Sequence, residues 1–258
     1  MTTDDLGPDA LRPSFRGREF RTYPALLSTA ADAMAWARAG GPSGSVVVAD
    51  YQASPRGRAG LEWRVRPGAS LCFSMILRPG LPPEREGWLY TVAATALAET
   101  FGSDAEIEWP DEVLSGERRV ASLGVHAELG PHVVDWAVLN VLVPDAAPPR
   151  GPLAAGIVEA VERRLAMRPD AVLVDYLARC RTIGRRVRAR LIPMGPGGVK
   201  IEGTAVESKL DGALTIGTLR EMHVSVRPQN LGALEPLESD AAPEPTYPDY
   251  RQLYLRDP

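Results

Sequence analysis

Apolar positions divide the first 181 residues into alternating strand-like and helix-like segments. The continuous apolar run at residues 46–49 is typical of a strand buried on both faces, and residues 70–77 also predict a strand. Residues 118–128 and 133–143 flank a Leu-Gly-Pro turn and predict two paired strands. Helix-favouring segments lie at residues 25–39, 85–101, 153–167 and 170–181. This alternation predicts an α/β (α+β) fold, with a mixed β-sheet flanked by helices.

After residue 183 the pattern changes to short strands without helices, at residues 185–192, 199–206, 212–217 and 221–227. Turns rich in glycine separate these strands, which predicts a small β-barrel. We therefore expect four parts along the chain. They are a loose N-terminal arm at 1–20, an α/β domain at 21–181, the β-barrel at 182–235 and an acidic, proline-rich tail at 236–258.

Charge and cysteine usage narrow the class of protein. The net charge is −4, so no overall basic field favours nucleic acid. Two cysteines, Cys72 and Cys180, do not make a disulfide framework, and we expect both to be inert thiols. The first residues are polar and acidic, unlike a signal peptide, and no apolar stretch is long enough to span a bilayer. These features predict a cytoplasmic protein without a membrane or nucleic-acid partner.

The basic residues are almost all arginine. Of 29 basic side chains, only Lys200 and Lys209 are lysines. Chemistry that needs a lysine, such as a Schiff base or a phosphate-loop lysine, is therefore excluded before residue 200. Arginine instead binds carboxylate and phosphate oxygens through its planar fork of donors.

The segment after the first buried run resembles the biotin–protein ligase family. That family carries a buried strand, a Gln, a Gly-Arg-Gly-Arg-x-Gly loop and then a Trp. This chain has Gln52, the sequence Pro55-Arg56-Gly57-Arg58-Ala59-Gly60, and Trp63. Glycine lets the backbone approach a ligand closely, and the two arginines suit an anionic one.

Further segments resemble the family in its own order, over roughly residues 25–235. Residues 27–29 are similar to its Ser-Thr-Asn helix start, and residues 108–112 to its Lys-Trp-Pro-Asn-Asp. Residues 118–126 are similar to its Arg-Lys-Leu-Ala-Gly-Ile-Leu-Val-Glu strand, and residues 135–140 to its Gly-x-Gly-x-Asn. The part from residue 182 resembles its C-terminal SH3-like domain.

The resemblance implies a reaction and its participants. The family uses biotin and ATP with Mg to form an acyl-adenylate, biotinyl-adenylate. It then passes biotin to a lysine on a biotin-carrier domain of a carboxylase. Many members form a homodimer, and some carry an N-terminal helix-turn-helix. Residues 1–20 leave no room for such a module, so we do not expect a DNA-binding repressor.

The resemblance also assigns site residues. Arg119 takes the position of the central lysine that contacts the reacting carboxylate and the α-phosphate, and is the expected catalytic residue. The expected ligand-binding residues are Ser28, Thr29, Gln52, Arg56, Gly57, Arg58, Trp63 and Asn140. No metal site is expected, because the carboxylates at 108–112 and His126 lack close ligand spacing.

Departures from the family pattern cluster at this expected site. Arg119 and Glu108 replace lysines, and Trp136 and Val138 replace both glycines of Gly-x-Gly-x-Asn. An arginine is bulkier and more rigid than a lysine, so catalysis is expected to be weakened. Three interpretations stay open. The chain is a short-form ligase that uses Arg119, a non-catalytic relative that binds a ligand or a carrier, or a transferase for a different acyl group.

Overall fold

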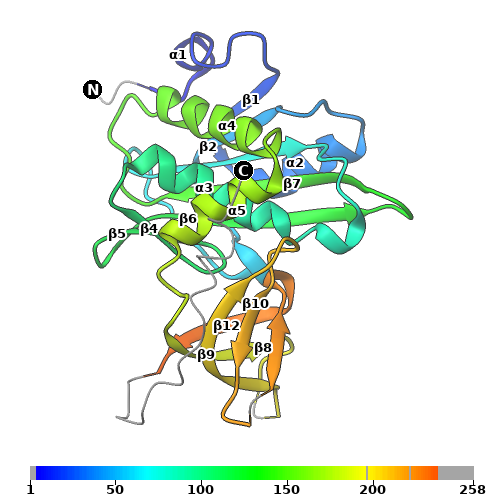
Figure 1. The fold of residues 1–258 in the computed structure, drawn as a ribbon. Helices are drawn as coiled ribbons and strands as arrows, with labels where there is room; N and C mark the ends of the chain where they lie inside the picture. Colours follow the sequence, from blue (N-terminus) through cyan, green and yellow to red (C-terminus); the bar gives the residue numbers. More distant parts are fainter. Residues whose placement is uncertain (1–3, 196, 221, 238–258) are drawn as a thin grey trace.

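The computed structural model describes residues 4–195, 197–220 and 222–237. The larger of its two sheets has seven strands in the order β1-β2-β3-β7-β6-β5-β4 (Figure 1). β1 pairs in parallel with β2, and every other neighbouring pair is antiparallel, so the sheet is mixed. The strands are β1 Phe20–Leu26, β2 Val46–Gln52, β3 Leu71–Leu77, β4 Ala105–Glu108, β5 Glu112–Ser115, β6 Arg118–Leu129 and β7 Val134–Val143.

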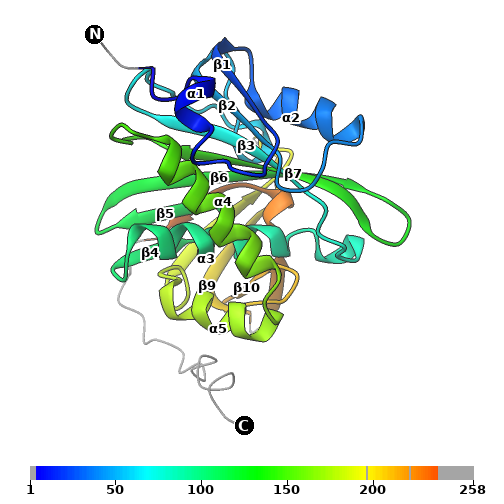
Figure 2. The ribbon, with the colours of Figure 1, turned by 90° about the horizontal axis from the view of Figure 1, so that it is seen from above.

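Helices cover both faces of this sheet (Figure 2). α2 (Thr29–Arg38) packs on one face, where its alanines meet apolar side chains of β2, β3 and β7. α3 (Trp88–Phe101) and α4 (Gly151–Leu165) pack on the other face, and α5 (Pro169–Arg179) lies against α3 and β4. α3 is apolar around most of its circumference because helices and strands enclose it.

A five-stranded antiparallel sheet follows, in the order β11-β10-β9-β8-β12, consistent with an SH3-like domain. Its strands are β8 Arg186–Leu191, β9 Lys200–Ser208, β10 Leu214–Gly217, β11 His223–Val226 and β12 Leu231–Pro236. The predicted fold class is therefore confirmed, and we keep residues 21–181 and 182–235 as the proposed extents of its two parts.

The expectation of a loose N-terminal arm is wrong for residues 5–20. Leu6, Leu11 and Phe15 are fully buried against the main core, and a short helix, α1 (Pro8–Leu11), lies between them. The sequence shows no periodicity here because single apolar residues, rather than a helical stripe, make these contacts. The proline-rich tail begins at residue 236, and its residues from 238 lie outside the described residues.

Three strands were not expected from the pattern, namely β1, β5 and β12, whereas β4 ends where residues 107–110 look like a strand end in the sequence. β1 is an edge strand that contains Pro24 and is mostly half-buried or exposed, so it carries no clear apolar signal. The predicted helix at 25–39 consequently begins only at Thr29, because the residues up to Leu26 pair with β2.

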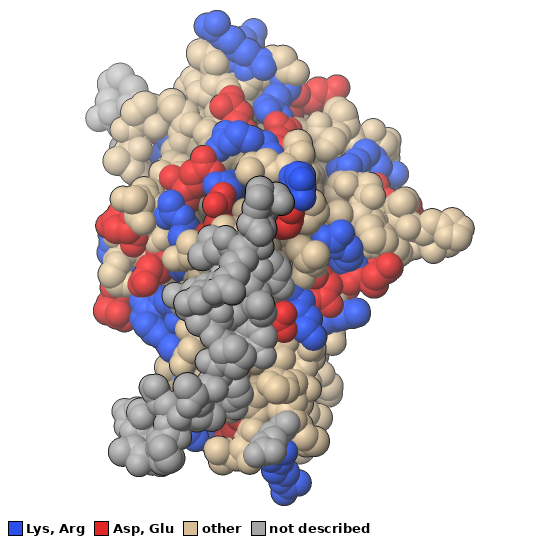
Figure 3. All heavy atoms as spheres, viewed as in Figure 1, with Lys and Arg blue, Asp and Glu red and all other residues tan. Residues whose placement is uncertain are grey.

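Charges of both signs are interspersed on the face seen in Figure 3. Many arginines take part in ion pairs, as in Arg164, which contacts both Glu99 and Asp175. Among the described residues, no helix is both long and apolar enough to cross a membrane.

Candidate functional site

Four buried polar side chains form a continuous hydrogen-bonded row across the sheet, which we call the polar row: Gln52, Thr29, Ser74 and Asn140. The backbone N–H of Thr29 donates to Gln52 Oε1 at 2.8 Å. The hydroxyls of Thr29 and Ser74 lie 2.8 Å apart, and Ser74 Oγ donates to Asn140 Oδ1 at 2.8 Å. Three of the residues predicted for the ligand site are therefore brought together.

Sheet register and the short β1–α2 turn produce this row. Ser74 on β3 is directly opposite Asn140 on β7, so their side chains share one face. Gln52 ends β2, and Thr29 starts α2 three residues after β1 ends beside it. Ser28 caps α2 by accepting a hydrogen bond from the N–H of Ala31 at 3.4 Å.

One donor of the polar row has no partner. Gln52 Nε2 is buried and makes no hydrogen bond within the described part of the chain, where the neighbouring Cys72 thiol, whose pKa Gln52 lowers, is only a weak acceptor. A buried amide N–H without an acceptor is costly, and native structures usually supply one. A ligand oxygen beside Gln52 would satisfy this group.

The Arg-Gly-Arg loop (residues 53–69) joins β2 to β3 and lies against β6. A Cβ added to Gly124 on β6 would meet Arg58 N and Gly57 C at 2.8 Å. A Cβ added to Gly57 would meet Trp63 Nε1 at 2.4 Å. Trp63 therefore lies on Gly57, and Gly57 lies on Gly124. At both positions the neighbouring atoms lie too close to leave space for a Cβ atom.

Each arginine predicted for the site is paired with a carboxylate of this chain. Arg56 contacts Glu62 at 3.0 Å in the exposed part of the loop. Arg119, whose side chain is 55% exposed, contacts Glu112 at 2.9 Å.

Arg58 is the most enclosed of the three. Its side chain is only 5% exposed and contacts Asp111 at 3.0 Å. Arg58 Nη1 also donates to the backbone carbonyl of Leu231 on β12. Arg58 thus ties the Arg-Gly-Arg loop to the C-terminal sheet as well as to the β4–β5 turn.

Burial is the largest influence on the pKa values of the two acidic partners, Asp111 and Glu112. It raises the pKa of Asp111 above its ordinary value, and the nearby charges of Arg58 and Arg119 only partly oppose this. Burial likewise raises the pKa of Glu112, where Arg119 opposes the shift while Asp111 and Glu108 add to it. The site therefore holds several carboxylates close together against two guanidinium groups.

The two residues that replace the family's glycines fill the space under α2. Trp136 is 5% exposed and Val138 is fully buried, and both pack on Ala33 and Ala37 of α2. The His126 ring lies 5.8 Å from the Trp136 ring on the same face. The space beside α2 is consequently occupied by protein side chains rather than left open.

Sequence reasoning missed several residues of this site. Ser74 connects Thr29 to Asn140, and only the pairing of β3 with β7 identifies it. Gly124 was detectable, because an isolated glycine within a strand pattern indicates a close backbone approach. Asp111 and Glu112 were considered only as carboxylates of the segment 108–112, and not as partners of Arg58 and Arg119. Among the residues that the structure describes, no group of three or more His, Cys, Asp or Glu side chains is placed to hold a metal ion.

The fold is that of biotin protein ligases. The biotin protein ligase from Aquifex aeolicus, in complex with biotin and ATP, superposes with a TM-score of 0.63 at 20% identity, over 85% of this chain and 99% of that one. A biotin protein ligase-like protein of unknown function from Silicibacter superposes with a TM-score of 0.59 at 13% identity, over 82% of this chain and 95% of that one.

Sequence similarity identifies the family. The biotin–[acetyl-CoA-carboxylase] ligase of Mycobacterium tuberculosis is 31% identical over 217 residues, covering 73% of this chain and 79% of that protein. The bifunctional ligase/repressor BirA of Bacillus subtilis is 32% identical over 118 residues, covering 44% of this chain and 36% of that protein. No family model matches the chain. The chain belongs to the biotin protein ligase family.

Proposed function

We propose that this protein binds biotin, or a small acyl ligand of similar polarity, between the polar row and the Arg-Gly-Arg loop. We also propose that it activates the acid much more slowly than an ordinary biotin–protein ligase. The observation that carries this proposal is the pairing of Arg119 with Glu112 at 2.9 Å. A guanidinium that a carboxylate already neutralises is less available to negative charge that develops in a reaction.

The polar row supports binding of a neutral polar head group. Gln52 Nε2 offers a buried donor without a partner, and the ureido oxygen of biotin is an acceptor of the required kind. Trp136 and Val138 fill the α2 side of the row, so a ligand would have to approach from the side of the loop. Trp63 lies over the loop backbone and would cover a ligand held there.

The side chains present do not fit a triphosphate as they stand. Arg56 and Arg58 are paired with Glu62 and Asp111, and Glu108 lies directly opposite Glu112 in the β4–β5 ladder. ATP and its magnesium would have to displace these carboxylates before the arginines could bind phosphate. The side chains as placed therefore support no chemical step through ATP. Within this chain, Arg58 instead holds the loop on the sheet, and Arg119 lies on β6 at the position proposed for the catalytic cation.

Partners follow from the family and remain proposals. A biotin-carrier domain of a carboxylase is the expected acceptor if transfer takes place. The homodimer implied by the resemblance and the cytoplasmic location expected from charge and cysteine usage are also predictions. Sedimentation equilibrium of the purified chain, with a dimer mass as the expected result, checks the first of them.

The test is an activity assay with purified protein, biotin, MgATP and a biotin-carrier domain. We expect labelling of the carrier to be at least about 100-fold slower than by an ordinary ligase of the family, because one misplaced transition-state contact typically costs that much. Labelling at ordinary ligase rates would refute weakened catalysis. Calorimetric titration with biotin tests binding separately, and Gln52→Ala should abolish any heat observed.

Rescue variants distinguish the possible causes of the weakened activity. Arg119→Lys restores the smaller cation, and the triple variant Arg119→Lys, Trp136→Gly, Val138→Gly also reopens the space under α2. Arg118→Lys is the matched control, because it makes the same change on the adjacent, exposed residue of β6. Recovery with Arg119→Lys alone would assign the whole loss to that position. Absence of binding and of recovery in every variant would instead favour a transferase for a different acyl group.

A further inference from the structure

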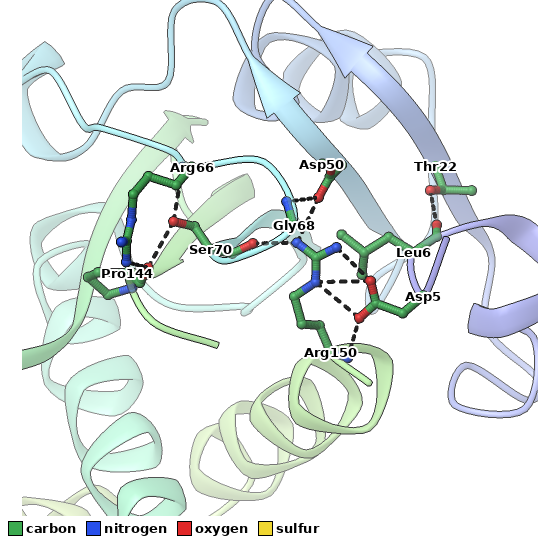
Figure 4. Close-up of polar contacts among 9 residues, drawn as sticks. All are labelled: Asp5, Leu6, Thr22, Asp50, Arg66, Gly68, Ser70, Pro144 and Arg150. Atoms are coloured by element: carbon green, nitrogen blue, oxygen red, sulfur yellow. Dashed lines mark hydrogen bonds and ion pairs between the residues drawn. The ribbon is translucent and has the colours of Figure 1, made fainter. Parts of the chain in front are cut away.

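A buried arginine outside the candidate site connects the two ends of the Arg-Gly-Arg loop. Arg150 directly precedes α4, and its side chain is 3% exposed. Its Nη1 donates to Asp50 Oδ1 and to the carbonyl of Ser70, both at 2.7 Å (Figure 4). Its Nη2 donates to Asp5 Oδ1 at 2.6 Å, and its backbone N–H donates to Asp5 Oδ2 at 2.7 Å.

The partners of Arg150 lie where the loop leaves and rejoins the sheet. Asp50 is two residues before Gln52 at the end of β2, and its Oδ1 also accepts from the N–H of Gly68 at 2.9 Å. Ser70 directly precedes β3, and its hydroxyl donates to the carbonyl of Pro144 at 2.9 Å. One guanidinium therefore holds both ends of the segment that carries Arg56, Gly57, Arg58 and Trp63.

Asp5 makes this arrangement stable in a buried position. A buried cation is costly unless it is paired and its donors are satisfied, and Asp50 alone is partly exposed to solvent. Asp5 supplies a second, buried carboxylate that binds Arg150 through both oxygens. The surrounding N-terminal segment (residues 4–19) is fixed in turn by buried Leu6, Leu11 and Phe15.

We propose that Asp5 and Arg150 are positioning residues, through which the N-terminal segment clamps both ends of the Arg-Gly-Arg loop and holds it against β6. The role of this loop in ligand binding rests on the proposed function above, whereas the clamp itself rests on these contacts. Order in the loop then depends on a segment about 50 residues earlier in the chain.

Hydrogen–deuterium exchange of the full chain tests the clamp without a ligand. Asp5→Asn keeps the shape of the side chain but removes its charge. We expect amide exchange in residues 53–69 to rise at least about 10-fold, while exchange in β3 and β7 stays unchanged. No rise within the loop, or an equal rise in β3 and β7, would overturn the proposal.

Glu162→Gln is the matched control. Glu162 on α4 binds Arg18 through both oxygens, so it ties the same N-terminal segment to the same helix. In the part of the chain that the structure describes, neither Glu162 nor Arg18 makes a hydrogen bond or ion pair with the loop. We expect Glu162→Gln to leave loop exchange unchanged. A rise in loop exchange equal to that in Asp5→Asn would show that Asp5 only helps to fix the N-terminal segment, and it would overturn the proposal.

A second variant keeps the test decisive if Asp5→Asn fails to fold. Asp50→Asn leaves the buried Asp5–Arg150 pair intact and removes only the charge at the start of the loop. Faster exchange in residues 53–69 supports the clamp, and unchanged exchange overturns it.

Biotin titration then separates this inference from the proposed function. If wild-type protein binds biotin, Asp5→Asn should weaken its apparent affinity about 10-fold, and unchanged affinity would count against the clamp. If wild-type protein binds no biotin, the proposed ligand is wrong, and the exchange experiment alone decides the clamp.

Discussion

At the scale of single residues, the polar and charged side chains of the site form hydrogen bonds and ion pairs with one another. Ser74 Oγ lies between Thr29 and Asn140, and the arginines at 58 and 119 are each held by a carboxylate. The sequence identified Thr29, Gln52 and Asn140 through motif residues at fixed spacing. It could not identify Ser74, because the role of a serine in a buried strand depends on which residue lies opposite it on the neighbouring strand.

Ser74→Ala tests the energetic role of the polar row. The substitution leaves the buried Asn140 Oδ1 without its donor and leaves Thr29 Oγ1 with Gln52 Oε1 alone, at 3.2 Å, so the free energy of unfolding should fall by about 1–3 kcal/mol. Denaturant unfolding measures the change. Ser45→Ala is the control, because Ser45 Oγ is equally buried but has no hydrogen-bond partner in the described residues. Equal losses in the two variants would contradict a special role for Ser74.

The two thiols provide a prediction that depends on pKa. Burial raises the pKa of Cys72 to about 12, against a smaller opposing effect of Gln52, and burial also raises the pKa of Cys180. At pH 8 only about one Cys72 in ten thousand is a thiolate, and the thiolate is the reactive form. Native protein should therefore not react with Ellman's reagent at pH 8. Unfolded protein should release two equivalents of thionitrobenzoate per chain, one for each cysteine. Rapid reaction of the native chain would show that one thiol is accessible.

At the scale of elements, the Arg-Gly-Arg loop is positioned by β6, on which it packs, and by Arg150, which binds both of its ends. Motif similarity located the loop in the sequence but gave no information about its supports, because these come from β6, α4 and the N-terminal segment. The pattern also missed β1, an edge strand whose half-exposed residues carry no alternation. Edge strands and loop supports are set by neighbours that are distant in sequence.

Gly124→Ala tests the contact between loop and strand. Its Cβ would meet loop backbone at 2.8 Å, and backbone cannot rotate away as a flexible side chain can. We expect the free energy of unfolding to fall by about 1–3 kcal/mol and proteolysis within residues 53–69 to accelerate. Gly156→Ala on α4 is the control, since nothing lies within 4 Å of its added Cβ and alanine favours a helix. A stability of Gly124→Ala equal to that of wild type would contradict the close approach.

At the scale of the whole molecule, the two sheets share one apolar core. Leu214, Ile216 and Leu231 of the C-terminal sheet belong to the same buried cluster as the helices of the larger part. Trp109 Nε1 donates to the carbonyl of Gly212 at 3.0 Å, and Arg58 donates to that of Leu231. The C-terminal sheet therefore supports the Arg-Gly-Arg loop as well as the core.

A shared core predicts one cooperative unfolding transition. Differential scanning calorimetry should give a single peak whose calorimetric and van 't Hoff enthalpies agree. Trp109→Phe removes one hydrogen bond worth about 1 kcal/mol, so it should lower the Tm by about 2–4 °C without splitting the peak. Two separate peaks for wild-type protein would show that the two parts unfold independently.

The sequence by itself determined the order of most elements, the fold class and the family. These depend on apolar periodicity and on short motifs, which are local properties of the chain. The tertiary structure alone decided which charges neutralise one another, that Trp136 and Val138 fill the space under α2, and that Leu6, Leu11 and Phe15 pack on the main core. Most of these properties depend on contacts between segments that are distant in sequence, such as Arg58 with Asp111, and no local pattern encodes those contacts.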